Sequence, residues 1–176
     1  MKKNIFILLI IILTVIFQTS VIPLCFSERN IPDFVLIEMV SAVAVFGFQL
    51  TWIWVIIAGI ILDLFSFSAL GFNVFPFIFF SYATSFFSRR LILGEKIGGI
   101  LVGTIFVFLM TFLNNFWIQL IGAGFKFQKI QEINGFFLES TGWKMILNLI
   151  LFFLCILFFK RIKKKLSPSN NLLLEK

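Results

Sequence analysis

The 176-residue sequence contains no histidine, and only 13% of its residues are charged. Without histidine, the commonest metal ligand and general base among the side chains is missing. The two cysteines, Cys25 and Cys155, stand alone, so their spacing matches neither a metal site nor a disulfide framework. A G-x-S-x-G nucleophile motif and a phosphate-binding glycine loop are also absent. The sequence therefore predicts a protein that is not an enzyme and has no cofactor or metal ion.

What the sequence has in abundance is apolar residues, which make up 60% of the chain, with 27 phenylalanines and a mean hydropathy of +1.08. A soluble domain is about half apolar and about a quarter charged. Several apolar runs approach the roughly 20 residues that cross a bilayer as a helix. We therefore expect an all-α polytopic integral membrane protein, with one transmembrane domain over residues 1–166 and a disordered cytoplasmic tail over 167–176.

The polar breaks between these runs divide the domain into six predicted transmembrane helices. The apolar stretch 34–67 is too long for one helix across a hydrocarbon core of about 30 Å, so it must fold back at Gly47-Phe48-Gln49. The first run is read as an uncleaved helix because no small-x-small cleavage site follows it. The predicted helices span about 5–26, 34–47, 50–65, 72–88, 97–120 and 143–159.

The basic residues are distributed unevenly along the chain. With six helices both termini lie on one side, which then carries eleven of the 15 lysines and arginines. The positive-inside rule places that side in the cytoplasm, so we expect a multi-pass membrane protein with both termini cytoplasmic. Because the charge of +7 clusters at the chain ends and in one loop, it fits anionic lipid at the basic C-terminus, and nucleic acid is not expected as a partner.

One polar motif lies at the junction between the third and fourth predicted helices, at Gly59, Asp63, Gly71 and Asn73. Asp63 ends an otherwise uncharged apolar run, and a charge at membrane depth costs at least about 2.5 kcal/mol unless it is paired or hydrated. Gly59 lies one helical turn earlier on the same face, where a missing side chain lets a neighbouring helix approach. Two interpretations stay open for Asp63: a helix-terminal carboxylate satisfied by water, or one with a specific partner.

Other polar residues fall toward the same, outer end of the predicted helices. They form a candidate outer polar cluster: Gln18, Glu38, Asn114, Asn115 and Gln119. Such groups lie against one another more favourably than against lipid. The cluster is either a set of interhelical hydrogen bonds that fixes the bundle or a shallow, outward-open site for a ligand or for a partner's helix.

The run from Ile31 to Tyr82 resembles the rod shape-determining protein MreD family. The matching features are Ile31-Pro32-Asp33-Phe34 and Gly59-x3-Asp63-x7-Gly71-x-Asn73, together with the chain length, the six-helix hydropathy and the basic C-terminus. The resemblance implies a non-enzymatic subunit of the bacterial cell-elongation (rod) complex, located in the bacterial cytoplasmic (inner) membrane. Such a subunit binds the bitopic protein MreC and supports a SEDS glycosyltransferase, a transpeptidase and MreB filaments in peptidoglycan synthesis. Gly59, Asp63 and Gly71 then have a structural or partner-contact role.

The resemblance also implies a fold similar to the substrate-binding subunits of energy-coupling-factor transporters. That likeness supplies an alternative function from a different class, a vitamin-binding subunit of such a transporter. The segment Ser27–Asp33 is short for the long outer loop that usually covers the pocket of those subunits.

Overall fold

A computed structural model of the chain describes residues 2–25, 31–87, 97–122 and 134–166, and within these residues it contains helices and turns but no strand. The predicted tail 167–176 lies outside the described residues. The helical elements are α1 (Lys2–Ile16), the π-helical segment η1 (Phe17–Val21), α2 (Ile22–Cys25), α3 (Phe34–Phe46), α4 (Phe48–Phe65), α5 (Val74–Phe87), α6 (Ile97–Gly122) and α8 (Asn134–Leu166). Since α1, η1 and α2 follow one another without a break, the described chain forms six apolar helical segments, as the hydropathy predicted.

The six segments differ in length. Four are long and apolar enough to cross a membrane, with windows at Ile7–Leu24, Phe48–Phe65, Val102–Ile121 and Gly142–Lys165. The other two, α3 and α5, have 13 and 14 residues and measure only about 20 Å, against a hydrocarbon core of about 30 Å. The prediction of six spanning helices is therefore supported by length for four of them.

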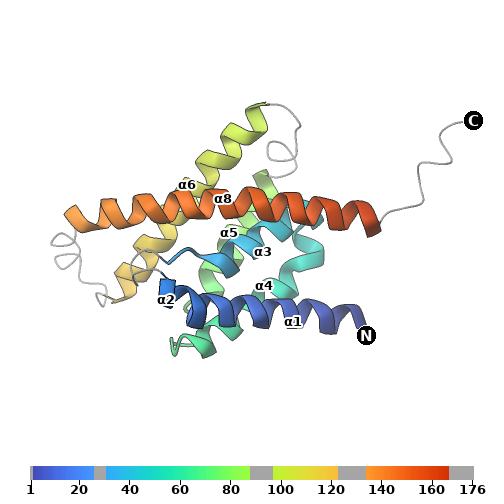
Figure 1. Ribbon diagram of the computed structural model, residues 1–176, viewed down its shortest axis with the longest axis horizontal. Coiled ribbons are helices and arrows are strands. Elements are labelled where there is room, and N and C mark those ends of the chain that lie inside the picture. The colour runs from blue at the N-terminus through green and yellow to red at the C-terminus, as the bar shows by residue number, and fades with distance from the viewer. Residues whose placement is uncertain (1, 26–30, 88–96, 123–133, 167–176) are drawn as a thin grey trace, which may run out of the picture.

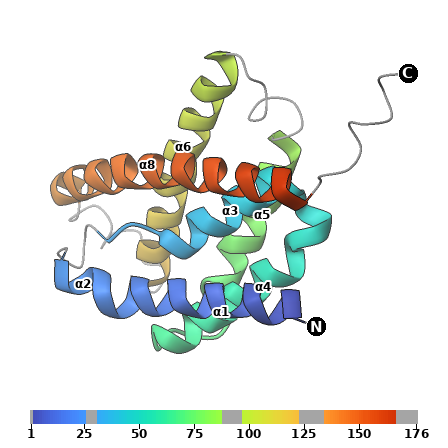
Figure 2. The same cartoon turned by 45° about the vertical axis from the view of Figure 1, so that its right-hand side comes forward.

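The helix α3 tolerates its short length because it lies in the middle of the protein. Ten of its 13 residues are buried. It packs against α1, α4, α5 and α8, and Figures 1 and 2 show it between α1 on one side and α8 on the other. Most of its surface is therefore covered by protein, and the helix need not reach from one membrane surface to the other.

Gly47 separates α3 from α4, at the predicted fold-back. Its φ of +87° belongs to the left-handed side of backbone space, which glycine adopts without a steric penalty. The Gly47 N–H donates to the Val43 carbonyl at 2.8 Å and ends α3. Immediately after this residue α4 begins at Phe48, so one glycine reverses the chain.

The chain directions follow from contacts between helix ends. Gln18, late in the first helix, lies at the start of α3, whereas Lys163, late in α8, lies at the end of α3. Helices α3 and α8 are therefore parallel, and α1 is antiparallel to both. As a result α1 begins and α8 ends at the same end of the molecule (Figure 1).

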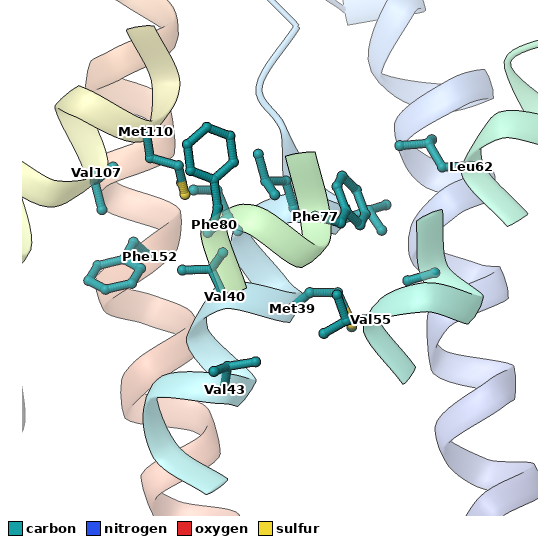
Figure 3. Close-up of a cluster of buried hydrophobic side chains, with 14 of the residues drawn as sticks. Met39, Val40, Val43, Val55, Leu62, Phe77, Phe80, Val107, Met110 and Phe152 are labelled. Atoms are coloured by element: carbon teal, nitrogen blue, oxygen red, sulfur yellow. The ribbon is translucent and has the colours of Figure 1, made fainter. Parts of the chain in front are cut away.

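The hydrophobic core connects the short helices to the long ones. Figure 3 shows Met39, Val40 and Val43 of α3 beside Phe77 and Phe80 of α5, with Met110 of α6 and Phe152 of α8 on one side and Val55 and Leu62 of α4 on the other. Fully burying a side chain of this size contributes about 1.5–3 kcal/mol in water, and in lipid the same contacts act through close packing.

Several helix boundaries differ from the sequence-based prediction by a few residues or more, and the differences at the last and the fourth helix have a physical reason. The last helix was predicted over 143–159, but α8 runs from Asn134 to Leu166. Hydropathy marks only the apolar part of a helix, and lysine and arginine, which follow Phe159, are good helix formers. The fourth helix was predicted from residue 72, but α5 begins at Val74 because the preceding residues form a turn around Asp63.

Candidate functional site

The four motif residues meet in the turn between α4 and α5. The Asp63 carboxylate is fully buried and accepts four hydrogen bonds from the turn that follows it. The Gly71 N–H donates to Oδ2 at 2.7 Å. The other oxygen, Oδ1, accepts from the Asn73 N–H at 2.9 Å, from Asn73 Nδ2 at 2.8 Å and from the Ser68 hydroxyl at 3.0 Å. One side chain thus satisfies the donors of an irregular segment.

The two glycines of the motif act in different ways. Gly71 has a φ of +96°, which turns its N–H toward Asp63, and an added Cβ would meet open space. Gly59 is a contact residue, because a Cβ there would lie 2.8 Å from Val74 Cα and 2.9 Å from its Cγ2. Gly59 therefore permits the first residue of α5 to touch α4, and Gly71 permits the turn that brings it there.

The turn also holds Phe67 at a φ of +53°, with 97% of its side chain exposed. A left-handed non-glycine residue is strained and persists only when its surroundings fix the backbone. Ser68 provides that restraint, because its N–H and its hydroxyl bond to the Asp63 main-chain and side-chain oxygens. Of the two interpretations left open for Asp63, the geometry favours specific partners, and these partners belong to the same turn.

A second polar site joins the start of α3 to α8. Lys144 Nζ lies 2.9 Å from Asp33 Oδ1, and both side chains are about nine-tenths buried. Asn148, one helical turn after Lys144, accepts the Asp33 N–H at 2.9 Å and places its Nδ2 at 3.3 Å from Asp33 Oδ2. The carboxylate at the start of α3 also interacts favourably with the positive end of the helix dipole.

Helix α6 completes this second site. Thr111 Oγ1 accepts a hydrogen bond from Asn148 Nδ2 at 3.1 Å, and Asn115 Oδ1 accepts one from Lys144 Nζ at 2.9 Å. The network therefore ties α3, α6 and α8 together at one level.

Of this network the sequence analysis named Asn115, as a member of the outer polar cluster, and Asp33, within the segment Ile31-Pro32-Asp33-Phe34. The missed signal was the pairing of two polar residues four apart on each helix, Thr111 with Asn115 and Lys144 with Asn148, which places each pair on one face.

Gln18 caps the same end of α3 from the other side. Its Oε1 accepts the Val35 N–H at 2.8 Å, so it satisfies one of the free donors in the first turn of α3. Gln18 belongs to the π-helical segment η1, an insertion that is frequent at functional sites and that changes the direction of the side chains around it.

The remaining members of the predicted outer cluster lie apart from these contacts. Glu38 has Thr14 of α1 as its hydrogen-bonding neighbour. Asn114 is buried, and its Oδ1 has no partner among the described residues. Gln119 is partly buried. Two of the five predicted residues thus have described roles, Gln18 at the start of α3 and Asn115 beside Lys144, and a common outer cluster stays a prediction.

The chemistry available at these sites is that of hydrogen bonds and ion pairs. In the part of the chain that the structure describes, no three His, Cys, Asp or Glu side chains are grouped as metal ligands. At both polar sites the donors and acceptors described above bond to other groups of the same chain, in helices and in the turn after α4. This arrangement fixes the helix ends of a membrane bundle.

Comparison with known proteins gives one family. The family model described as rod shape-determining protein MreD matches residues 1–164. Neither the curated proteins nor the solved structures give a match.

Proposed function

The chain belongs to the MreD family of rod shape-determining membrane proteins, and from this premise we propose that it is a non-enzymatic subunit of the cell-elongation complex that binds an MreC-like bitopic protein. The observation that carries the proposal is the extent of the family match, which covers residues 1–164 of 176. The apolar helices and the family place the chain in the bacterial inner membrane. Through its partner it would support a SEDS glycosyltransferase, a transpeptidase and MreB filaments, and thereby peptidoglycan synthesis.

The contacts of the buried polar groups support a scaffolding role. Asp63, Asp33 and Lys144 are buried in contacts within the chain and hold helix ends in fixed positions. A protein that recruits others within the membrane needs such a rigid framework, because preorganisation lowers the entropic cost of binding. A catalyst would instead need reactive groups facing a substrate.

For the membrane orientation we propose that both termini are cytoplasmic. The start of α1 and the end of α8 lie at the same end of the molecule (Figure 1). That end carries the exposed basic residues Lys160, Arg161, Lys164 and Lys165. By the positive-inside rule it faces the cytoplasm, where these side chains also meet the anionic lipid headgroups of the inner leaflet.

The proposal is tested by affinity purification of the full-length protein in mild detergent, followed by identification of the co-purifying chains. We expect an MreC-like protein and further elongation subunits. Recovery of an ATPase pair with a coupling membrane subunit would instead support the vitamin-transport alternative. A thermal-shift screen with vitamins, run on the same preparation, provides an independent readout, and stabilisation by a vitamin without a partner would overturn the scaffold role.

A further inference from the structure

Helix α3 leaves one narrow stripe of its surface uncovered. Phe34, Glu38 and Phe46 are partly exposed and Ala42 is 9% exposed, whereas the other residues of α3 are buried. These positions are four residues apart, so they lie along one face of the helix. The stripe therefore has an aromatic residue at each end and a carboxyl group near its centre, and the small, nearly buried Ala42 lies between Glu38 and Phe46.

Two long helices border this stripe. Figures 1 and 2 show α1 on one side of α3 and α8 on the other, and both pack on α3. At one end the ring of Phe34 packs edge-on against Phe17 of α1, with centroids 5.5 Å apart. At the other end Phe46 packs against Phe159 of α8, with centroids 5.9 Å apart. We call this strip of α3 and its two borders the α1–α8 groove.

Glu38 lies near the mid-depth of the membrane in this groove. Its hydrogen-bonding neighbour Thr14 is central in the spanning window Ile7–Leu24. Cys155, which lies within electrostatic reach of the carboxyl group, is central in the window Gly142–Lys165. Glu38 lies about one turn from the start of α3, as the sequence placed it, and because α3 is short this position falls beside the centres of the two spanning windows.

The carboxyl group of Glu38 is incompletely satisfied. Its Oε2 has no hydrogen-bond partner among the described residues. Asp33 and Asp63, by contrast, are bonded on both oxygens. Oε2 itself is covered by the chain's own atoms, but the glutamate χ3 torsion is broad, so rotation about it can exchange the positions of the two oxygens.

We propose that the α1–α8 groove binds one transmembrane helix of a partner protein, which places a hydrogen-bond donor opposite Glu38. The donor is a Ser, Thr, Asn, Gln, Lys or Arg side chain near the middle of that helix. A polar group facing lipid at this depth is costly, and a helix from a partner removes the cost by bonding it. Ala42 lets the backbone of that helix approach closely. A phospholipid does not fit, because its donors lie in the headgroup region and its acyl chains have none at mid-depth.

The identity of the partner rests on the proposed function, so the experiment separates the two claims. The MreC-like protein is co-expressed with the chain carrying Cys25→Ser, which keeps Cys155 in the groove as the one thiol. Single cysteines are then placed along the partner's transmembrane helix and oxidised. The matched control carries Cys155→Ser and Leu109→Cys, because Leu109 is 55% exposed on α6 and lies outside the groove.

We expect Cys155 to crosslink to one face of the partner helix, with a period of three to four residues, and the cysteine at position 109 to give no such pattern. Glu38→Leu should lower recovery of the partner about three- to ten-fold, as expected for the loss of one interhelical hydrogen bond in lipid. Glu38→Gln keeps an acceptor and should retain most of the binding. Size-exclusion profiles of all variants verify that they remain inserted and monodisperse.

Other outcomes would contradict the groove assignment, the proposed function, or both. If the partner co-purifies but Cys155 does not crosslink and Glu38→Leu binds normally, the groove assignment is wrong while the proposed function stands. If the wild-type chain recovers no partner, both claims fail. A phospholipid that native mass spectrometry finds on the wild-type chain and not on Glu38→Leu would show that lipid occupies the groove, and would overturn the inference.

Discussion

The Gly71 N–H donates a 2.7 Å hydrogen bond to Asp63 Oδ2, across eight residues of chain. Gly71 can present its N–H in this direction because its φ is +96°. The bond connects the end of α4 to the residues that start α5, and it accounts for the seven-residue spacing between the two motif positions. The carboxylate and the glycine are therefore parts of one structural device, and separate changes to either should weaken the same turn.

Replacing the carboxylate tests this device directly. Asp63→Ala leaves four donors without their acceptor, and the desolvation cost of a buried unsatisfied group is about 1–3 kcal/mol, so we expect a clear drop in melting temperature in detergent. Asp63→Asn keeps the oxygen that accepts from Asn73 and Ser68. The drop in its melting temperature should therefore be roughly half of that for Asp63→Ala. Equal melting temperatures for Ala, Asn and wild type would show that the hydrogen bonds do not stabilise the turn.

Gly59→Ala should lower the thermal stability of the protein more than Gly103→Ala does. At position 59 the new Cβ would lie 2.8 Å from the backbone of Val74, which cannot move without displacing α5, and overpacking of this kind costs about 1–3 kcal/mol. Gly103 is the matched control, because a Cβ there meets only Phe152 Cε1 at 3.6 Å. In a helix interior alanine is more favourable than glycine by about 1 kcal/mol, so Gly103→Ala should be neutral or stabilising. Thermal unfolding of both variants in one detergent gives the comparison.

Gly71→Ala should destabilise through backbone conformation alone. The added methyl group would meet no atom within 4 Å, but a φ of +96° is unfavourable for alanine by about 1–2 kcal/mol. Gly142→Ala is the control, since that position is also open but has no positive φ and lies within α8. A melting temperature for Gly71→Ala that equals the wild-type value would argue against the φ-based account of this position.

Substitutions of Asp33 and Lys144 should have strongly non-additive effects on the free energy of unfolding, because the two side chains form a buried ion pair. Lys144→Met leaves the buried Asp33 carboxylate without its charged partner, and breaking a buried pair from one side costs about 3–5 kcal/mol. Asp33→Asn combined with Lys144→Met removes both charges and should recover much of that loss. A double-mutant cycle on the free energy of unfolding measures the coupling. Additive effects of the two single changes would mean that the pair contributes nothing as a pair.

Reporter fusions test the membrane orientation. A fusion after Lys165, at the end of α8, should report a cytoplasmic position because the basic residues from Lys160 onward follow a spanning segment. A fusion between α6 and α8, within residues 126–133, should report the periplasm. A periplasmic signal from the first fusion would reverse the orientation and exchange the inner and outer ends of the bundle.

The sequence by itself determined the helical segments, the fold-back and the motif. Long apolar runs are sufficient to locate membrane helices, and a glycine between two such runs was sufficient to place the reversal at Gly47. The motif from Gly59 to Asn73 could be recognised because the hydrogen bonds of its carboxylate are local, within ten residues of Asp63. The family resemblance drawn from these residues is confirmed by the match over residues 1–164.

Only the tertiary structure decided which faces of these helices are inside. In a membrane protein the faces toward lipid and toward protein are both apolar, so hydropathy does not distinguish them. The partners of Asn148 illustrate this limit, since its bonds reach Asp33, 115 residues away, and Thr111, 37 residues away. No local pattern encodes such distances. For the same reason the sequence listed Glu38 with other polar residues, whereas the packing of α1, α3 and α8 sets it apart as a carboxyl group with an unpaired oxygen.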